Sequence, residues 1–189
     1  MTMAEKDRDR TAAFLDLQEG RGPVPVLDDA GIERAMRATR RIAVVGASSN
    51  PSRPSFSVFR YLVQQGFECI PINPNEQDVL GVPAYRTLKA AVTATGRFDM
   101  VDVFRRSELC LPHAHEAVAE TGRFDMVDVF RRSELCVPHA QEAAATGARV
   151  LWLQLGIVNW EAATIAHEGG LEVVMDRCTA IEWRRIAGR

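Results

Sequence analysis

The segment formed by residues 42–75 constrains the fold more than any other part of the chain. It contains a short apolar run rich in β-branched residues, a loop of small residues, an amphipathic stretch and a second apolar run. The first run, residues 42–45, is typical of a strand buried on both faces. Residues 67–72 have the same character. This strand–loop–helix–strand order predicts an α/β fold built on a parallel sheet.

The loop after the first strand has the composition of a phosphate-binding turn. Gly46 lets the backbone turn sharply, and Asn50 or Ser52 is a candidate cap for the helix in which Pro54 occupies the first turn. Three small residues leave the main chain open to a ligand: Ala47, Ser48 and Ser49. Loop N–H groups and a helix N-terminus attract phosphate oxygens, so we expect a phosphate-bearing ligand here.

The usual dinucleotide-binding motif is absent. Gly46 is the single glycine of the loop, and the second strand ends in Asn73 and Pro74 without the acidic residue that binds an adenosine ribose in NAD sites. Arg53 in the loop suits a ligand with extra phosphate charge. An NAD(P)-type binding module and a turn without any ligand remain alternatives.

Five separated blocks resemble a known family in the right order. These blocks are residues 44–54, 71–75, 102–108, 150–157 and 173–178. On them, the chain is similar to small bacterial stand-alone CoA-binding proteins and to the CoA-binding domain of succinyl-CoA synthetase alpha subunits. The resemblance spans about residues 30–185. It implies a doubly wound parallel sheet, a Rossmann-like CoA-binding domain, with helices on both faces.

The resemblance also implies a ligand, coenzyme A or an acyl-CoA, lying across the carboxyl ends of the strands. Its pyrophosphate is expected at the first loop, at Gly46, Ala47, Ser48, Ser49, Asn50, Arg53 and Pro54. Its adenosine is expected beside Asn73 and Pro74. Neighbouring strand ends are expected to contribute Phe104, Arg105, Gln154 and Gly156.

The chain departs from the family in one large way, because a segment of 16 residues occurs twice. Residues 95–110 recur without change as residues 121–136, and the similarity continues to about residue 143. Each copy is predicted to form one strand and one helix, so duplicated βα units occupy about residues 95–120 and 121–146. Phe130 and Arg131 are the second copy's equivalents of Phe104 and Arg105, and both pairs are candidates for the same contact.

The duplication leaves two structural outcomes open. One copy can be an extra βα unit inserted into the sheet through a right-handed crossover, which is the outcome we favour. Alternatively, one copy is looped out and exposes Phe, Met and Val side chains, at a cost of about 25 cal/mol per Å² of apolar surface. A looped-out copy would need a partner chain to cover it. In either case, one of the two Arg-Arg pairs can be a solvated strand end with no ligand.

Composition limits the remaining possibilities. The 189 residues are 47% hydrophobic with a formal net charge of −2, which suits one α/β domain and gives no basic footprint for nucleic acid. The sequence contains no apolar run of about 18 residues, which a membrane span would need, and its charged N-terminus does not resemble a signal peptide. We therefore expect a cytoplasmic protein. We predict a mobile tail over residues 1–25 and the domain over residues 26–189.

The sequence suggests no catalytic or metal-binding residues. The four cysteines form no C-x-x-C pair, and no Ser-His-Asp arrangement is indicated. The synthetase relatives use a phosphorylated His in a second domain and a nucleotide-binding subunit, for which this chain has no room. We therefore expect a small-molecule binding protein without catalysis, acting as a carrier, sensor or regulator. The alternative is an interaction protein with a vestigial pocket, in which the duplicated unit forms a homodimer contact.

Overall fold

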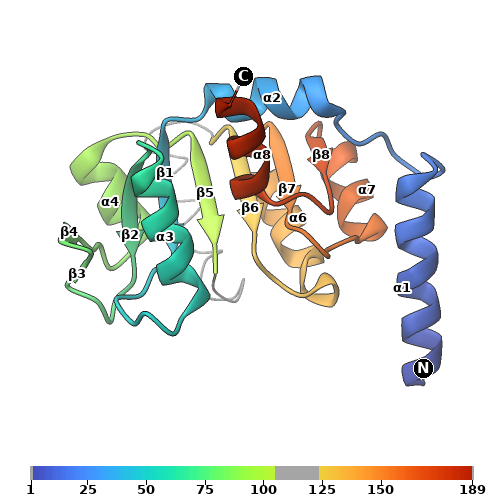
Figure 1. Ribbon diagram of the computed structural model, residues 1–189, viewed down its shortest axis with the longest axis horizontal. Coiled ribbons are helices and arrows are strands. Elements are labelled where there is room, and N and C mark those ends of the chain that lie inside the picture. The colour runs from blue at the N-terminus through green and yellow to red at the C-terminus, as the bar shows by residue number, and fades with distance from the viewer. Residues whose placement is uncertain (1, 105–123, 189) are drawn as a thin grey trace.

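A parallel β-sheet forms the centre of the molecule. The computed structural model describes residues 2–104 and 124–188. Within these residues, six strands pair in the order β2-β1-β5-β6-β7-β8, and every pair is parallel (Figure 1). The strands are β1 (Arg41–Val45), β2 (Glu68–Ile72), β5 (Met100–Val103), β6 (Met126–Val129), β7 (Val150–Leu153) and β8 (Glu172–Val174). The predicted α/β fold with a parallel sheet is confirmed.

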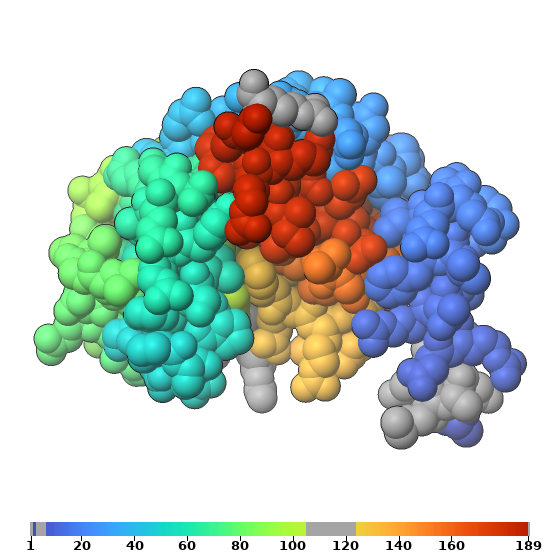
Figure 2. All heavy atoms as spheres, viewed as in Figure 1, coloured from blue at the N-terminus to red at the C-terminus, as the bar shows by residue number. Residues whose placement is uncertain are grey.

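Helices cover both faces of this sheet, as the prediction of a doubly wound sheet requires. One face carries α2 (Asp29–Ala38), α3 (Pro54–Gln64) and α8 (Thr179–Ala187). The other face carries α4 (Leu88–Thr95), α6 (Val137–Ala145) and α7 (Trp160–Glu168). Alternate strand residues enter the two cores, with Val44 in one and Val45 in the other. Figure 2 shows α8 lying between α3 and α2.

The duplicated strands lie side by side in the sheet. β5 and β6 both read Met-Val-Asp-Val, and they pair in register from Met100 opposite Met126 to Val103 opposite Val129. Both repeated strands are therefore part of the sheet, which agrees with an inserted unit. In the second copy, a short 3-10 helix η2 (Ser133–Leu135) precedes α6, which begins with Pro138 in its first turn. The helix predicted for the first copy lies outside the described residues.

The N-terminal segment differs from its prediction. We predicted a mobile tail over residues 1–25, and within it α1 (Met3–Gln18) is a helix (Figure 1). Ala13, Phe14 and Leu17 pack against the core, and Trp160 Nε1 donates a hydrogen bond to the Ala13 carbonyl over 3.2 Å. The Gly and Pro residues from 20 to 25, which would break a helix, follow α1 and do not interrupt it.

The strand order creates a topological switch point at one edge of the sheet. β1 lies between β2 and β5, so the chain leaves β1 toward one side and returns on the other. Ligands of open α/β sheets bind at such a switch point, outside the carboxyl ends of the strands. In Figure 1, β5 points toward the lower edge of the view, where the loop between β1 and α3 also lies. A separate antiparallel pair, β3 (Asp78–Val79) and β4 (Val82–Pro83), follows β2.

Candidate functional site

The loop after β1 begins with a conformation that favours glycine. Gly46 has a φ of +86°, and its N–H donates to the Ile72 carbonyl at the end of β2 over 2.8 Å. A side chain is strained in this left-handed region. Ala47 is fully buried beneath the turn, whereas Ser49 and Asn50 are exposed. The predicted phosphate loop is therefore anchored at its base, and its tip lies at the surface of the protein.

Asn73 fastens this loop to the end of β2. Its side chain is buried, and Nδ2 donates to the Ala47 carbonyl over 2.7 Å. Its Oδ1 accepts from the Asn75 N–H at 3.1 Å, and the carbonyl of the next residue, Pro74, accepts from Arg86. The Asn73 side chain thus holds the backbone of two segments together, whereas the sequence suggested contact with a ligand.

A carboxylate that the sequence prediction missed occupies the tip of the loop. Glu76 Oε1 accepts hydrogen bonds from Ser48 Oγ at 2.9 Å and from the Ser49 N–H at 3.0 Å. Its Oε2 accepts from Ser49 Oγ at 2.6 Å. The bonds from Ser49 and Ser48 lower the pKa of Glu76. Residues chosen as candidate phosphate donors therefore already bind an anionic group of the protein itself.

The start of α3 differs from its prediction. Asn50 and Ser52 were candidate caps, but the N-cap position is Arg53, and its side chain makes no capping bond among the described residues. Asn50 Oδ1 instead accepts from both the N–H and the hydroxyl of Ser52, at 2.9 and 2.8 Å. These bonds shape the loop, and no side chain in the described part of the molecule caps α3, which begins at Pro54. Exposed Arg53 lies directly before it.

The ends of β5 and β6 place duplicated aromatic residues together. The rings of Phe104 and Phe130 stack with centroids 4.4 Å apart and an interplanar angle of 21°. Both residues are partly exposed, and each backbone N–H extends the sheet, to Val45 and Val103 respectively. Arg131 follows, and its Nε is buried without a hydrogen-bond partner within the described residues. Arg105, the first-copy candidate, lies outside those residues.

Buried polar groups lie beneath this edge. Gln154 Nε2 donates to both oxygens of Asp128, at 2.8 and 2.7 Å, and lies 2.9 Å from the Thr179 hydroxyl. Burial raises the pKa of Asp128 to about 7, although the bonds from Gln154 and Thr179 act in the opposite direction. Gln154, a predicted ligand contact, is itself buried, so its amide serves this network. The sequence prediction missed both Asp128 and Thr179.

The loop after β7 completes the edge. Gly156 has a φ of +79°, and its N–H donates to Asp176 Oδ1 over 2.7 Å. The N-cap position of α8 belongs to partly exposed Cys178, and Asp176 joins two loops. A cavity of about 490 Å³ opens beside them. Its lining includes Leu155, Met175, Asp176, Cys178 and Ile181.

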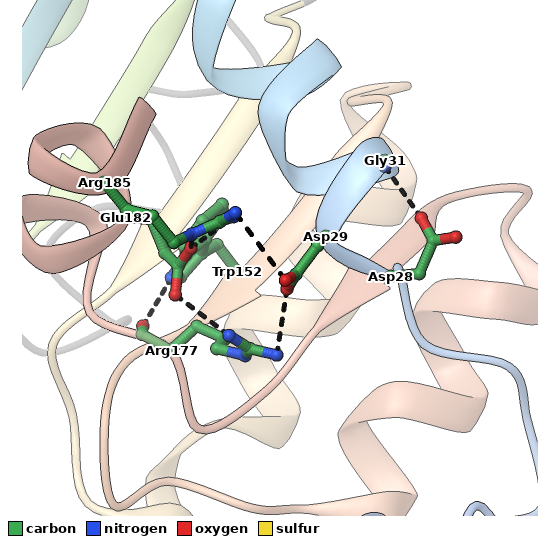
Figure 3. Close-up of polar contacts among 7 residues, drawn as sticks. All are labelled: Asp28, Asp29, Gly31, Trp152, Arg177, Glu182 and Arg185. Atoms are coloured by element: carbon green, nitrogen blue, oxygen red, sulfur yellow. Dashed lines mark hydrogen bonds and ion pairs between the residues drawn. The ribbon is translucent and has the colours of Figure 1, made fainter. Parts of the chain in front are cut away.

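Arg177, next to this cavity, belongs to a structural network. It pairs with Glu182 at 3.0 Å and with Asp29 of α2 at 3.3 Å. Arg185 contacts the same two carboxylates, and Trp152 Nε1 donates to the Arg177 carbonyl (Figure 3). Because both guanidinium groups already face carboxylates, this cluster ties α8 to α2 rather than adding to the edge described above.

The domain family follows from comparison with known proteins. A model of the CoA binding domain matches residues 40–123 and, a second time, residues 117–184. The two matches together run from the start of β1 into α8. The chain belongs to the CoA-binding domain family. The two matches of this family meet near residue 120, where the second copy begins, so each match contains one of the two duplicated units.

Relatives of known sequence agree with this family. The uncharacterized protein YneT of Bacillus subtilis is 35% identical over 152 residues, which are 80% of this chain and 91% of YneT. The alpha subunit of the ADP-forming acetate–CoA ligase II of Pyrococcus furiosus is 43% identical over 51 residues. Those residues are 26% of this chain and 11% of that subunit. The likeness to YneT is therefore nearly full-length, and the likeness to the ligase subunit is local.

Solved structures show the same fold. A hypothetical protein from Pyrococcus horikoshii has a TM-score of 0.57 and 28% identity, covering 86% of this chain and 94% of its own. The protein cell-free ID.343 from Thermus thermophilus has a TM-score of 0.56 and 28% identity, covering 85% of this chain and 99% of its own. The Rossmann-like architecture expected from the sequence is thus confirmed.

The described residues also bear on two other classes of site. None of their helices is long and apolar enough to cross a membrane. They contain no group of three or more His, Cys, Asp or Glu side chains arranged to hold a metal ion. Cys69 and Cys136 are buried, and burial raises the pKa of each thiol to about 12, so both behave as small core residues.

Proposed function

We propose that this protein binds coenzyme A or an acyl-CoA along the carboxyl edge of its sheet, as a non-catalytic carrier, sensor or regulator. One observation carries the proposal. The loop after β1, held by Gly46 and Asn73, places exposed residues at the switch point between β1 and β5, together with a helix start that no side chain of the described residues caps. This is where an α/β sheet binds the phosphates of its ligand, and the family is a CoA-binding one.

The remaining parts of the edge suit the rest of such a ligand. Adjacent strands lie about 4.8 Å apart, so the strand ends from β1 to β7 extend over about 14 Å, enough for an elongated molecule. Arg131 offers a cation with an unpartnered buried Nε. The apolar side chains of Leu155 and Ile181 at the cavity beside Cys178 suit a pantetheine arm or an acyl group. We favour a packing role for Cys178, and the alternative is thiol–disulfide exchange with oxidised CoA, in which Cys178 forms the mixed disulfide and one CoA thiol is released.

The location of binding can be tested residue by residue. We expect CoA, added to isotope-labelled protein, to shift the backbone amide resonances of Ser48, Ser49 and Arg53 in nuclear magnetic resonance spectra. Gly66 and Gly170, at the amino-terminal side of the strands that follow them, serve as internal controls and should not shift. Shifts confined to residues away from the loop would contradict the proposed site.

Other properties also remain proposals. We propose a cytoplasmic protein that does not bind nucleic acid, and a homodimer remains a prediction that light scattering on purified protein can test. An NAD(P)-type ligand is disfavoured because β2 ends in Asn73 and Pro74, whose polar groups contact the protein itself.

A further inference from the structure

Glu76 is an anionic group of the protein that sits on the loop proposed to receive the ligand's pyrophosphate. Three donors converge on its carboxylate: the hydroxyls of Ser48 and Ser49 and the Ser49 N–H. We propose that Glu76 is an internal competitor, which occupies the phosphate loop until the ligand displaces it and so sets the affinity and the pH dependence of binding. This inference rests on the function proposed above and concerns the regulation of the same site.

The contact has the chemistry of phosphate recognition. Hydroxyl and backbone N–H donors at 2.6–3.0 Å are the groups that bind phosphate oxygens, and a carboxylate accepts the same bonds. One donor set cannot serve two anions at once, and two anions at that distance repel each other. A phosphate that binds Ser48 and Ser49 must therefore move Glu76 away.

Glu76 is placed so that it can move. Its side chain is partly exposed and lies in the turn between β2 and β3, whereas neighbouring Asn73 is buried and bound to Ala47. Displacing Glu76 breaks three hydrogen bonds at the surface without opening the core. The loop itself keeps its shape, because the bond from the Gly46 N–H to Ile72 and the bond from the Asn73 side chain to Ala47 do not involve the Glu76 side chain.

Competition of this kind links binding to protons. In the free protein, the bonds from Ser49 and Ser48 lower the pKa of Glu76. In the complex, those bonds are lost and phosphate charge lies near, so the pKa of Glu76 rises. The complex then holds a proton that the free protein releases, and affinity increases as pH falls between the pKa of the complex and that of the free protein.

The test is calorimetry with two probes, CoA and inorganic pyrophosphate, on the wild type and two variants. Glu76→Gln removes the competing charge. Asp78→Asn is the matched control: it removes one negative charge at a position two residues away. The side-chain oxygen of the new Asn can still accept the hydrogen bond from the Gly81 N–H. We expect Glu76→Gln to bind both probes about ten-fold more tightly at about pH 7.5, the scale of one charge-assisted hydrogen bond, and Asp78→Asn to change little. The component of the pH dependence due to Glu76 should disappear in Glu76→Gln.

The outcomes separate this inference from the proposed function. Pyrophosphate affinities that are equal in the three proteins, or pyrophosphate binding in none of them, would overturn it. Weaker binding of CoA by Glu76→Gln would also overturn it, because Glu76 would then be a ligand contact. If CoA binds to none of the proteins while pyrophosphate binds more tightly to Glu76→Gln, the competitor is supported and CoA is the wrong ligand.

Discussion

Asp102 of β5 and Asp128 of β6 are register partners on adjacent parallel strands, and both carboxyl groups are buried. They are the same residue of the repeated segment, brought together by the duplication. Asp128 is bonded to Gln154 and Thr179, whereas both oxygens of Asp102 lack a hydrogen-bond partner among the described residues. Burial and the nearby Asp128 raise the pKa of Asp102 well above its ordinary value.

This pair predicts a stability that falls as pH rises. Both groups have a raised pKa in the folded protein, so the folded state holds protons that the unfolded state releases above about pH 4. The stability associated with these protons is present at acidic pH and is lost as pH rises through about 7 and beyond. Asp102→Asn should flatten this dependence, because an amide can donate to Asp128. At about pH 9 it should raise the free energy of unfolding by about 1–3 kcal/mol.

Asp128→Asn is the matched control, since it is the same substitution at the equivalent position of the other copy. It places an amide against the donors of Gln154 and Thr179, so it should destabilise the protein across the pH range. Thermal melts of the wild type and both variants between about pH 5 and pH 9 provide the comparison. Equal effects of the two substitutions would show that the two carboxyl groups are equivalent.

Gly46→Ala tests the conformation of the phosphate loop. A side chain at a φ of +86° costs about 1–2 kcal/mol and should shift the loop, so CoA binding should weaken markedly. Gly66→Ala has nearly the same φ, +87°, with open space around the added Cβ, and lies at the far end of α3. It should lose similar stability in denaturant melts but keep its CoA affinity. If CoA binding weakens in both variants, the loss of affinity comes from lower overall stability and not from the conformation of the phosphate loop.

Asn73→Ala tests the fastening of the loop. It removes the bond to the Ala47 carbonyl and leaves that buried group unpaired, at a cost of about 1–3 kcal/mol. Both the melting temperature and the CoA affinity should fall. Asn75→Ala, at an exposed position two residues on, should change neither. If Asn73→Ala lowers affinity and leaves stability unchanged, then Asn73 contacts the ligand as the sequence first suggested.

Arg131→Ala tests which copy of the duplicated unit faces the ligand. Loss of one charge-assisted contact with phosphate should weaken CoA binding about ten-fold. Arg132→Ala is the neighbouring control, because Arg132 is exposed and pairs with Glu134, so its loss should have little effect. A ten-fold loss in Arg105→Ala, with none in Arg131→Ala, would assign the contact to the first copy instead.

Much of the fold could be predicted because the apolar composition of the strands indicates that they are buried on both faces. β1 and β7 are short apolar runs that need cover on both faces, and this requirement leads to a parallel sheet with two helical layers. The insertion of the second copy was also predictable, because looping out Phe124 and Met126, which are buried, would expose them to water. Helix α1 was missed because its packing against Trp160 depends on residues far away in the chain.

The candidate site was less accessible to prediction. The loop at Gly46 could be placed because glycine is favoured at its φ. The role of Glu76 depends on the contact between the turn after β2 and Ser49, which is 27 residues away in the sequence. No local sequence pattern predicts this contact. Gln154 was correctly placed at a strand end, but its amide points to Asp128, a partner that only the register of β6 and β7 determines.

The most direct test of this account is calorimetry of the wild-type protein with CoA, dephospho-CoA and NAD. We expect saturable binding of CoA at one site per chain, weaker binding of dephospho-CoA because it lacks the charge of the 3′-phosphate, and the weakest binding of NAD. Absence of binding to all three, or preference for NAD over CoA, would contradict the account. The chain would then be an interaction protein or a different nucleotide-binding module built on the same fold.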